Sequence, residues 1–114
     1  MPAPAKSPKK TPRIGSPVRG STSGRPIMVA LDLLGRRGAL RIFWELRHGE
    51  QMTFRALQEA CDTNPSLLNT RIKELRDVGL LEHEEGGYRL APEGRKLMVS
   101  LGPFCDWAEG WRGA

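Results

Sequence analysis

A three-residue turn at positions 62–64 separates two short amphipathic segments, and this spacing constrains the fold more than any other feature of the chain. Before the turn, apolar residues recur at helical spacing over residues 54–61, and Thr53 is placed to cap that helix. After it, Asn64 and the proline that follows are typical of a helix start, and Gly79 ends the second helix. The sequence therefore predicts two helices joined by a tight turn.

Further helices and a hairpin surround this pair. Residues 29–34 and 38–47 have the apolar spacing of two earlier helices. Residues 80–91 predict two short strands around a Gly-Gly turn, and Pro92 opens a final helix, which the Gly-Pro pair at 102–103 should break or kink. The order helix, helix, helix, turn, helix, hairpin, helix is that of a winged helix-turn-helix. We therefore expect a mainly α fold with a small β-hairpin.

Residues 1–26 differ in composition from the rest of the chain. They contain six lysines and arginines, six prolines and no acidic residue. Such a segment cannot bury enough apolar surface to offset its ordering entropy, so we expect a disordered basic arm before a folded domain over residues 27–114. The whole chain has 18 basic and 13 acidic residues, a net charge of +5. Because the arm holds six of the basic ones, the folded domain is close to neutral and must bind any polyanion by local charge placement.

The second helix of the pair carries the candidate DNA-binding face. With Leu68 at the centre of its buried stripe, short polar side chains point outward near its N-terminal end, where a recognition helix meets base edges. Arginines on its sides suit backbone phosphates. An ordinary solvated helix face explains the same pattern, but the surrounding helix-turn-helix and hairpin favour DNA reading. The predicted recognition-helix contacts are Ser66, Asn69, Thr70, Arg71 and Lys73, with Arg76 at the DNA backbone.

Four motifs follow one another in the order and spacing of a known family. They are Ala30-Leu-Asp-Leu-Leu-Gly35; Phe54-x-x-Leu57-x-x-Ala60; Asn64-Pro65-Ser-Leu-Leu68-Asn-Thr-Arg71-Ile72-Lys-Glu74-Leu75 with Gly79-Leu80-Leu81-Glu82; and Tyr88-Arg-Leu90-Ala-Pro92-Glu-Gly94-x-x-Leu97, ending at Asp106-Trp107. Over this length, nearly the whole of the expected folded part, the chain resembles the HxlR family of winged helix regulators, relatives of the MarR group. Each motif is moderately specific, and their order together is much more so.

The resemblance implies a homodimer, held by the first and last helices, that regulates transcription from a palindromic operator. Apolar side chains on those two helices would form the dimer interface: Leu31, Leu34, Phe104, Trp107 and Trp111. The same side chains would alternatively cover the core of the monomer. Two other functions also stay open, a winged helix used as a protein-interaction module and an architectural DNA-binding protein held through its basic arm.

The wing and the start of the first helix depart from the family pattern. The wing tip, residues 82–87, is short and acidic, so we do not expect it to enter the minor groove. Arg89 on the return strand, and Lys9 and Lys10 in the arm, are the candidate phosphate contacts in its place. Several members of the family sense oxidants through a Cys-Pro pair before the first helix, where this chain has Arg25-Pro26. That thiol switch is therefore absent.

The sequence contains no set of residues typical of an enzyme. Its two histidines lie beside turns and no cluster has metal-ligand spacing, so we expect neither catalysis nor a metal or other cofactor. Cys61 and Cys105 fit packing positions better than a redox sensor. No apolar run approaches the ~20 residues of a membrane-spanning helix, and no signal peptide is recognisable. We expect a cytoplasmic, nucleoid-associated protein that binds double-stranded DNA and a second copy of itself, with any small-molecule effector left open.

Overall fold

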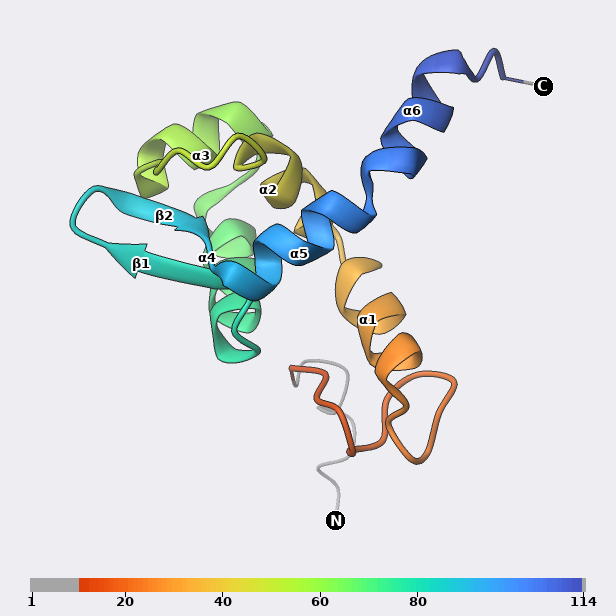
Figure 1. The fold of residues 1–114 in the computed structure, drawn as a ribbon. Coiled ribbons are helices and arrows are strands. Elements are labelled where there is room, and N and C mark those ends of the chain that lie inside the picture. Colours follow the sequence, from red (N-terminus) through yellow and green to blue (C-terminus); the bar gives the residue numbers. More distant parts are fainter. Residues whose placement is uncertain (1–10, 114) are drawn as a thin grey trace.

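The computed structural model describes residues 11–113. This part of the chain forms a group of helices, from one side of which a two-stranded antiparallel sheet projects (Figure 1). In chain order the elements are α1 (Pro26–Leu34), α2 (Ala39–Glu45), α3 (Phe54–Cys61), α4 (Pro65–Asp77), β1 (Leu81–Glu84), β2 (Gly87–Leu90), α5 (Pro92–Ser100) and α6 (Gly102–Gly110). The prediction of a mainly α winged helix-turn-helix with a small hairpin is confirmed.

Side-chain caps fix the two helices of the helix-turn-helix. The Thr53 hydroxyl accepts a hydrogen bond from the Ala56 amide at 3.1 Å, which starts α3. The Asn64 carboxamide oxygen accepts one from the Leu67 amide at 2.8 Å, which starts α4. Between them Asp62 ends α3 with a positive φ of 52°, a conformation that Asp adopts more readily than most residues. These local bonds satisfy orphan amides at both helix starts, so the turn has a defined geometry.

One hydrophobic core joins the helices to the hairpin. It takes the apolar stripe of α4, the inner faces of α2 and α3, and one residue from each strand. Burial of these side chains removes them almost completely from water and packs α4 against the other helices and the hairpin. The largest fully buried members are Phe43, Ile42, Leu46, Leu57, Leu68, Ile72, Leu75 and Leu90.

The hairpin is short, and the segment before α3 pairs with its second strand. Leu81 pairs with Leu90 and Glu84 with Gly87 across the two strands. Met52 exchanges backbone hydrogen bonds with Tyr88 at 2.9 and 2.8 Å, so β2 has a neighbour on both sides. Gly87 has a φ of 127° and lies against the Met52 carbonyl, where a side chain has no room.

The last helix leaves the body of the molecule. The Gly-Pro pair at 102–103 starts a new helix, α6, so the break expected from the sequence is present. None of the residues of α6 is buried, and in Figure 1 the helix projects away from α2 and α5. Its aromatic side chains, which the sequence offered as possible cover for the monomer's own core, are exposed instead.

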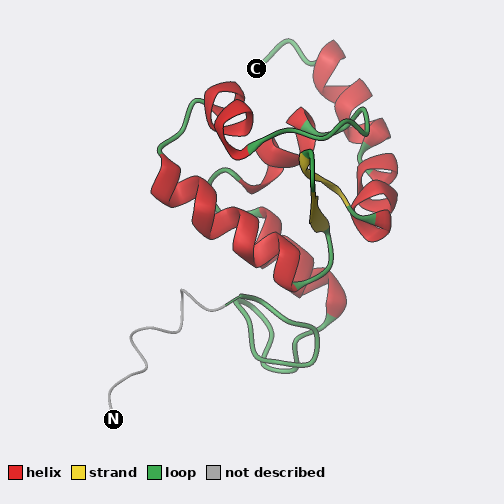
Figure 2. Ribbon diagram, turned by 90° about the vertical axis from the view of Figure 1, so that its left-hand side faces the viewer, coloured by secondary structure: helices red, strands yellow, loops and turns green. Residues whose placement is uncertain are grey.

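The segment before α1 has more internal bonding than a featureless arm. The Gly15 amide donates to the Gly24 carbonyl at 3.0 Å, and Val18 and Ser21 pair as an isolated bridge. These bonds close a loop over residues 11–25, at the bottom of the molecule in Figures 1 and 2. α1 begins at Pro26, one residue from the expected boundary at residue 27. Lys9 and Lys10, predicted as phosphate contacts, lie outside the described residues.

No helix among residues 11–113 is long and apolar enough to cross a membrane.

Candidate nucleic-acid interface

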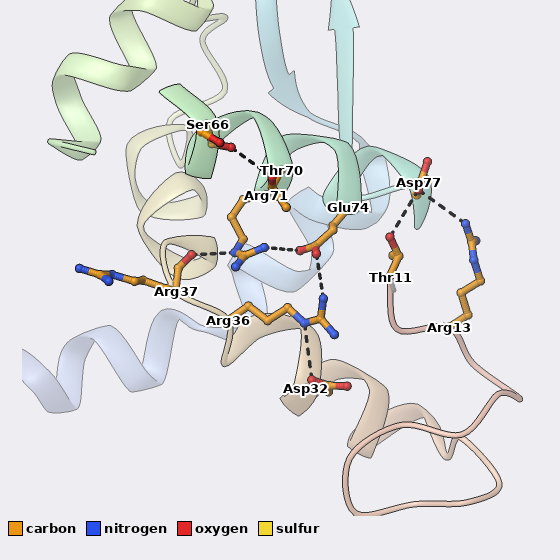
Figure 3. Close-up of polar contacts among 10 residues, drawn as sticks. All are labelled: Thr11, Arg13, Asp32, Arg36, Arg37, Ser66, Thr70, Arg71, Glu74 and Asp77. Atoms are coloured by element: carbon orange, nitrogen blue, oxygen red, sulfur yellow. Dashed lines mark hydrogen bonds and ion pairs between the residues drawn. The ribbon is translucent and has the colours of Figure 1, made fainter. Parts of the chain in front are cut away.

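The outward face of α4 carries short polar side chains, as the sequence predicted. Four of the five predicted contacts are exposed: Ser66, Asn69, Thr70 and Lys73. The Thr70 hydroxyl donates to the Ser66 carbonyl at 3.1 Å, so one edge of this face is tied back to its own helix (Figure 3). Asn69 and Lys73 make no side-chain hydrogen bond with any residue in the range 11–113. The two side chains with the most hydrogen-bonding capacity on this face are therefore unoccupied.

Arg71, the fifth predicted contact, lies in an internal network instead of on the outward face. Its Nε donates to the Arg37 carbonyl at 2.7 Å, and one terminal nitrogen donates to Glu74 at 2.9 Å (Figure 3). Its side chain is only 14% exposed. These partners take up part of the donor capacity of the guanidinium, so less of it is left for the DNA contact that the sequence predicts.

Glu74 is the centre of this network and the only buried charged residue within the described part of the chain. It accepts from Arg71 with one carboxylate oxygen and from Arg36 with the other, the latter at 2.8 Å. Arg36 also lies 3.6 Å from the carboxylate of Asp32 in α1. The four side chains join α1, the loop after it and α4 (Figure 3). Their charges balance, two positive against two negative, which is the condition for holding ions away from water.

The wing carries its own ion pairs. Arg89 on β2 donates to Glu82 at 2.6 Å and lies 3.1 Å from Glu84. The hydrogen bond to Glu82 is the main reason why the pKa of Arg89 lies above its ordinary value. The guanidinium therefore faces carboxylates on the neighbouring strand, and the wing presents little positive charge to a polyanion. Of the two predicted flanking contacts, Arg76 is exposed and Arg89 is paired.

The loop before α1 touches the C-terminal end of α4. The Asp77 carboxylate accepts from the Thr11 hydroxyl at 3.4 Å and lies 3.7 Å from the Arg13 guanidinium (Figure 3). Both members of the ion pair are more than half exposed, so it contributes little to stability. The contact shows that the start of the described chain lies beside the C-terminal end of α4.

The residues predicted for the dimer interface are apolar and accessible. Leu31 on α1 is 57% exposed, while Leu34 is half-buried against the core. On α6, Phe104 and Trp107 stack at 6.0 Å between ring centroids, and Trp107 and Trp111 at 5.2 Å. Two of these exposed rings lie on α6, which has no buried residue, and the third, Trp111, directly follows its end, so the three form one exposed apolar surface.

Sequence reasoning missed the buried network of Asp32, Arg36, Arg71 and Glu74. One signal was present, because Glu74 lies three residues after Arg71 and beside the apolar stripe of α4. The partner Arg36 is 38 residues away in sequence, and no local pattern connects the two. Elsewhere, burial is the main cause of the raised pKa of the Cys61 thiol, which lies half-buried at the end of α3. Within residues 11–113 no three His, Cys, Asp or Glu side chains are grouped as metal ligands.

Comparison with known proteins agrees with this geometry. A family model described as a helix-turn-helix domain matches residues 38–84, from the residue before α2 to the end of β1. Among solved structures, the quinone-bound YodB from B. subtilis superposes with a TM-score of 0.68 at 25% sequence identity, covering 75% of this chain and 98% of that chain. No curated protein sequence matches the chain. The family match, the fold and the solved structure agree that this chain contains a helix-turn-helix domain within a winged helix fold similar to that of YodB.

Proposed function

We propose that the protein regulates transcription as a homodimer that binds a palindromic operator through α4. The main support for this proposal is the outward face of α4. Its exposed polar side chains lie on the helix that the Asn64 cap starts directly after the turn of the helix-turn-helix. Asn pairs with adenine, and Lys with guanine or phosphate, so Asn69 and Lys73 supply base contacts while Ser66 and Thr70 adapt to several bases. Arg76, exposed on the flank, contacts the backbone.

Dimerisation through α1 and α6 is supported by exposed apolar surface. The ring stack of Phe104, Trp107 and Trp111 would remain in water in a monomer, at a cost that a second copy removes by covering it. Leu31 adds apolar area on α1, and Leu34 lies behind it. Two copies related by a two-fold axis would present two α4 helices, as a palindromic site requires.

The basic segment 1–26 is proposed to act as an arm that adds phosphate contacts, with Lys9 and Lys10 among them, while residues 27–114 form the DNA-reading domain. The contact between Thr11, Arg13 and Asp77 supports this division, because it brings the arm to the side of α4. A DNA-binding regulator of this kind acts in the cytoplasm, on the nucleoid.

The test begins with a selection of bound sequences from random duplex DNA, followed by footprinting of the selected site. We expect protection of a palindrome, with Asn69→Ala and Lys73→Ala each weakening specific binding by up to a few kcal/mol. If both variants bind the selected site like the parent, α4 does not read the operator. Deletion of residues 1–26 should weaken binding but keep the footprint. If the parent binds DNA of any sequence equally and the deletion abolishes this binding, the protein is an architectural DNA-binding protein held through its arm.

The dimer is tested separately by light scattering and by binding. Trp107→Ala should shift the mass in solution from two copies towards one and weaken operator binding, because each half-site is then bound independently. Lys96→Ala, an exposed change on α5, is the control and should leave the mass unchanged. A parent protein that is monomeric at micromolar concentration and still protects the whole palindrome would contradict the proposed assembly.

A further inference from the structure

Arg36 and Arg37 are neighbours in sequence but have different surroundings. The Arg36 side chain is 14% exposed and held by Glu74 and Asp32. The Arg37 side chain is exposed and makes no hydrogen bond or ion pair with any other described residue. Figure 3 shows it pointing away from the buried network. Only the second of these two arginines has a guanidinium available for an external ligand.

The backbone of Arg37 is fixed against α4. Its carbonyl accepts the 2.7 Å hydrogen bond from Arg71, and Arg71 is itself held by Glu74. Glu74 also binds Arg36, so the two residues of this loop are tied to α4 at consecutive positions. The root of the Arg37 side chain is therefore held at a set distance from the outward face of α4, although the side chain itself is exposed.

Arg37 lies between two open grooves that flank the start of α4. One groove, of about 890 Å³, lies between the loop before α1, α1 and α4, and both Ser66 and Thr70 line it together with Arg37. The other groove, of about 460 Å³, has Arg37 on one side and Asp62, Thr63, Asn64 and Leu67 on the other. The Asp62 carboxylate is the acidic group in this second groove, so Arg37 also offsets a negative charge near the start of α4.

We propose that Arg37 is a DNA backbone-phosphate contact and that Arg71 is the positioning residue that aims it. The proposal rests on the DNA-binding function proposed above, and it reassigns the phosphate contact from Arg71, where the sequence placed it, to the loop after α1. A helix in the major groove has phosphates along both of its sides, and Arg37 lies beside the side of α4 that carries Arg71. An exposed guanidinium anchored through its backbone loses less entropy on binding than one on a mobile tail.

The test measures how binding depends on salt, using a labelled duplex of random sequence about three helical turns long. Each phosphate contact adds about 0.9 to the slope of log affinity against log salt between about 50 and 200 mM NaCl. Arg37→Gln should therefore lower the slope by about 0.9 for each protomer bound. It should weaken random and selected duplexes by the same factor, roughly threefold to tenfold. Arg37→Lys should keep most of the slope, because a phosphate contact needs only the charge.

Arg112→Gln is the matched control. It also removes one exposed positive charge, and its only side-chain contact in residues 11–113 is a hydrogen bond to the Glu109 carbonyl at the far end of α6. Its salt slope should equal that of the parent. Asp62→Asn keeps a residue that tolerates positive φ and removes the carboxylate from the groove, so it should bind the random duplex more tightly. Unchanged affinity for Asp62→Asn would show that DNA does not approach this groove.

The positioning role of Arg71 is tested with Arg71→Lys. A lysine keeps the positive charge but cannot donate to both the Arg37 carbonyl and Glu74 in the geometry of the guanidinium. Arg71→Lys should therefore lower the salt slope as Arg37→Gln does, and the double variant should show no further fall. An Arg71→Lys variant with the slope of the parent, or a double variant with an additive fall, would mean that the two residues act independently, which overturns the positioning role of Arg71.

The possible failures are distinguishable. A parent that binds no duplex at about 50 mM NaCl overturns the DNA-binding function and the role of Arg37 with it. A parent that binds, with an Arg37→Gln variant of equal slope, overturns only the role of Arg37. Since the Arg37 side chain has no partner among residues 11–113, its removal should leave the thermal midpoint unchanged, so the slope is measured on a folded protein.

Discussion

Replacing Glu74 by alanine removes the centre of the buried charge network. Its two oxygens accept from Arg36 at 2.8 Å and from Arg71 at 2.9 Å, and the side chain is 5% exposed. The substitution leaves two guanidinium groups, each on a side chain 14% exposed, with no carboxylate between them. Asp32 remains, but it lies 3.6 Å from Arg36 only.

Removal of one partner from a buried ion pair typically costs about 3–5 kcal/mol, because the charge that remains has lost both its partner and its water. The two arginines retain some exposure and can turn towards solvent, so we expect the lower end, about 3 kcal/mol. In a folded part of this size, 1 kcal/mol lowers the thermal midpoint by about 4–8 °C, so Glu74→Ala should lower it by roughly 12–24 °C. A domain with about 5–15 kcal/mol of stability still folds at low temperature.

Urea and thermal unfolding of the parent and the variant measure the change. Glu93→Ala is the control, since its pair with Lys96 is exposed on both sides and should be worth less than about 1 kcal/mol. Raising the salt to about 1 M should leave the deficit of Glu74→Ala largely intact, because a buried pair is poorly screened. The triple change of Arg36 and Arg71 to methionine with Glu74→Leu should recover much of the loss.

The reasoning is refuted if Glu74→Ala loses no more free energy of unfolding than Glu93→Ala. A triple variant that is less stable than Glu74→Ala would also contradict it, because the cost would then come from lost hydrogen-bonding geometry and not from stranded charge. In that case the network lies between α1 and α4 but does not stabilise their contact.

Three further changes test the packing and one thiol. Gly94→Ala places a methyl group against the Leu80 carbonyl and should cost about 1–3 kcal/mol; an unchanged urea midpoint would mean that the backbone yields freely there. Leu57→Ala leaves a cavity in the core and should cost about 2–5 kcal/mol in the same assay; a loss below about 1 kcal/mol would place that side chain outside the core. Because burial raises the pKa of Cys61, its thiolate fraction near pH 8 is low, so in a Cys105→Ser background iodoacetamide should modify it several-fold more slowly than in urea; equal rates in the folded and unfolded protein would contradict the burial.

Local chemistry determined where the helices begin and end. The caps at Thr53 and Asn64 and the prolines at the starts of α4 and α5 act within three or four residues, so their effect is readable from the chain alone. Apolar spacing gave the buried stripe of α4 for the same reason, since a helix brings residues three and four apart onto one face. The order of the predicted helices and the hairpin along the chain then indicated the winged helix-turn-helix fold.

Only the tertiary structure decided how the arginines are used. Arg71, Arg36 and Arg37 all have the same side chain, and composition cannot rank them. Arg71 and Arg36 are paired inside because the loop after α1 packs on α4, a contact between residues more than 30 apart in sequence. Arg37 is exposed because its neighbour takes the inward position. The turn at 62–64 thus follows from hydrogen bonds between residues that are close in sequence. The positive charge that is free beside α4 depends instead on which arginines are already paired with the buried carboxylate of Glu74.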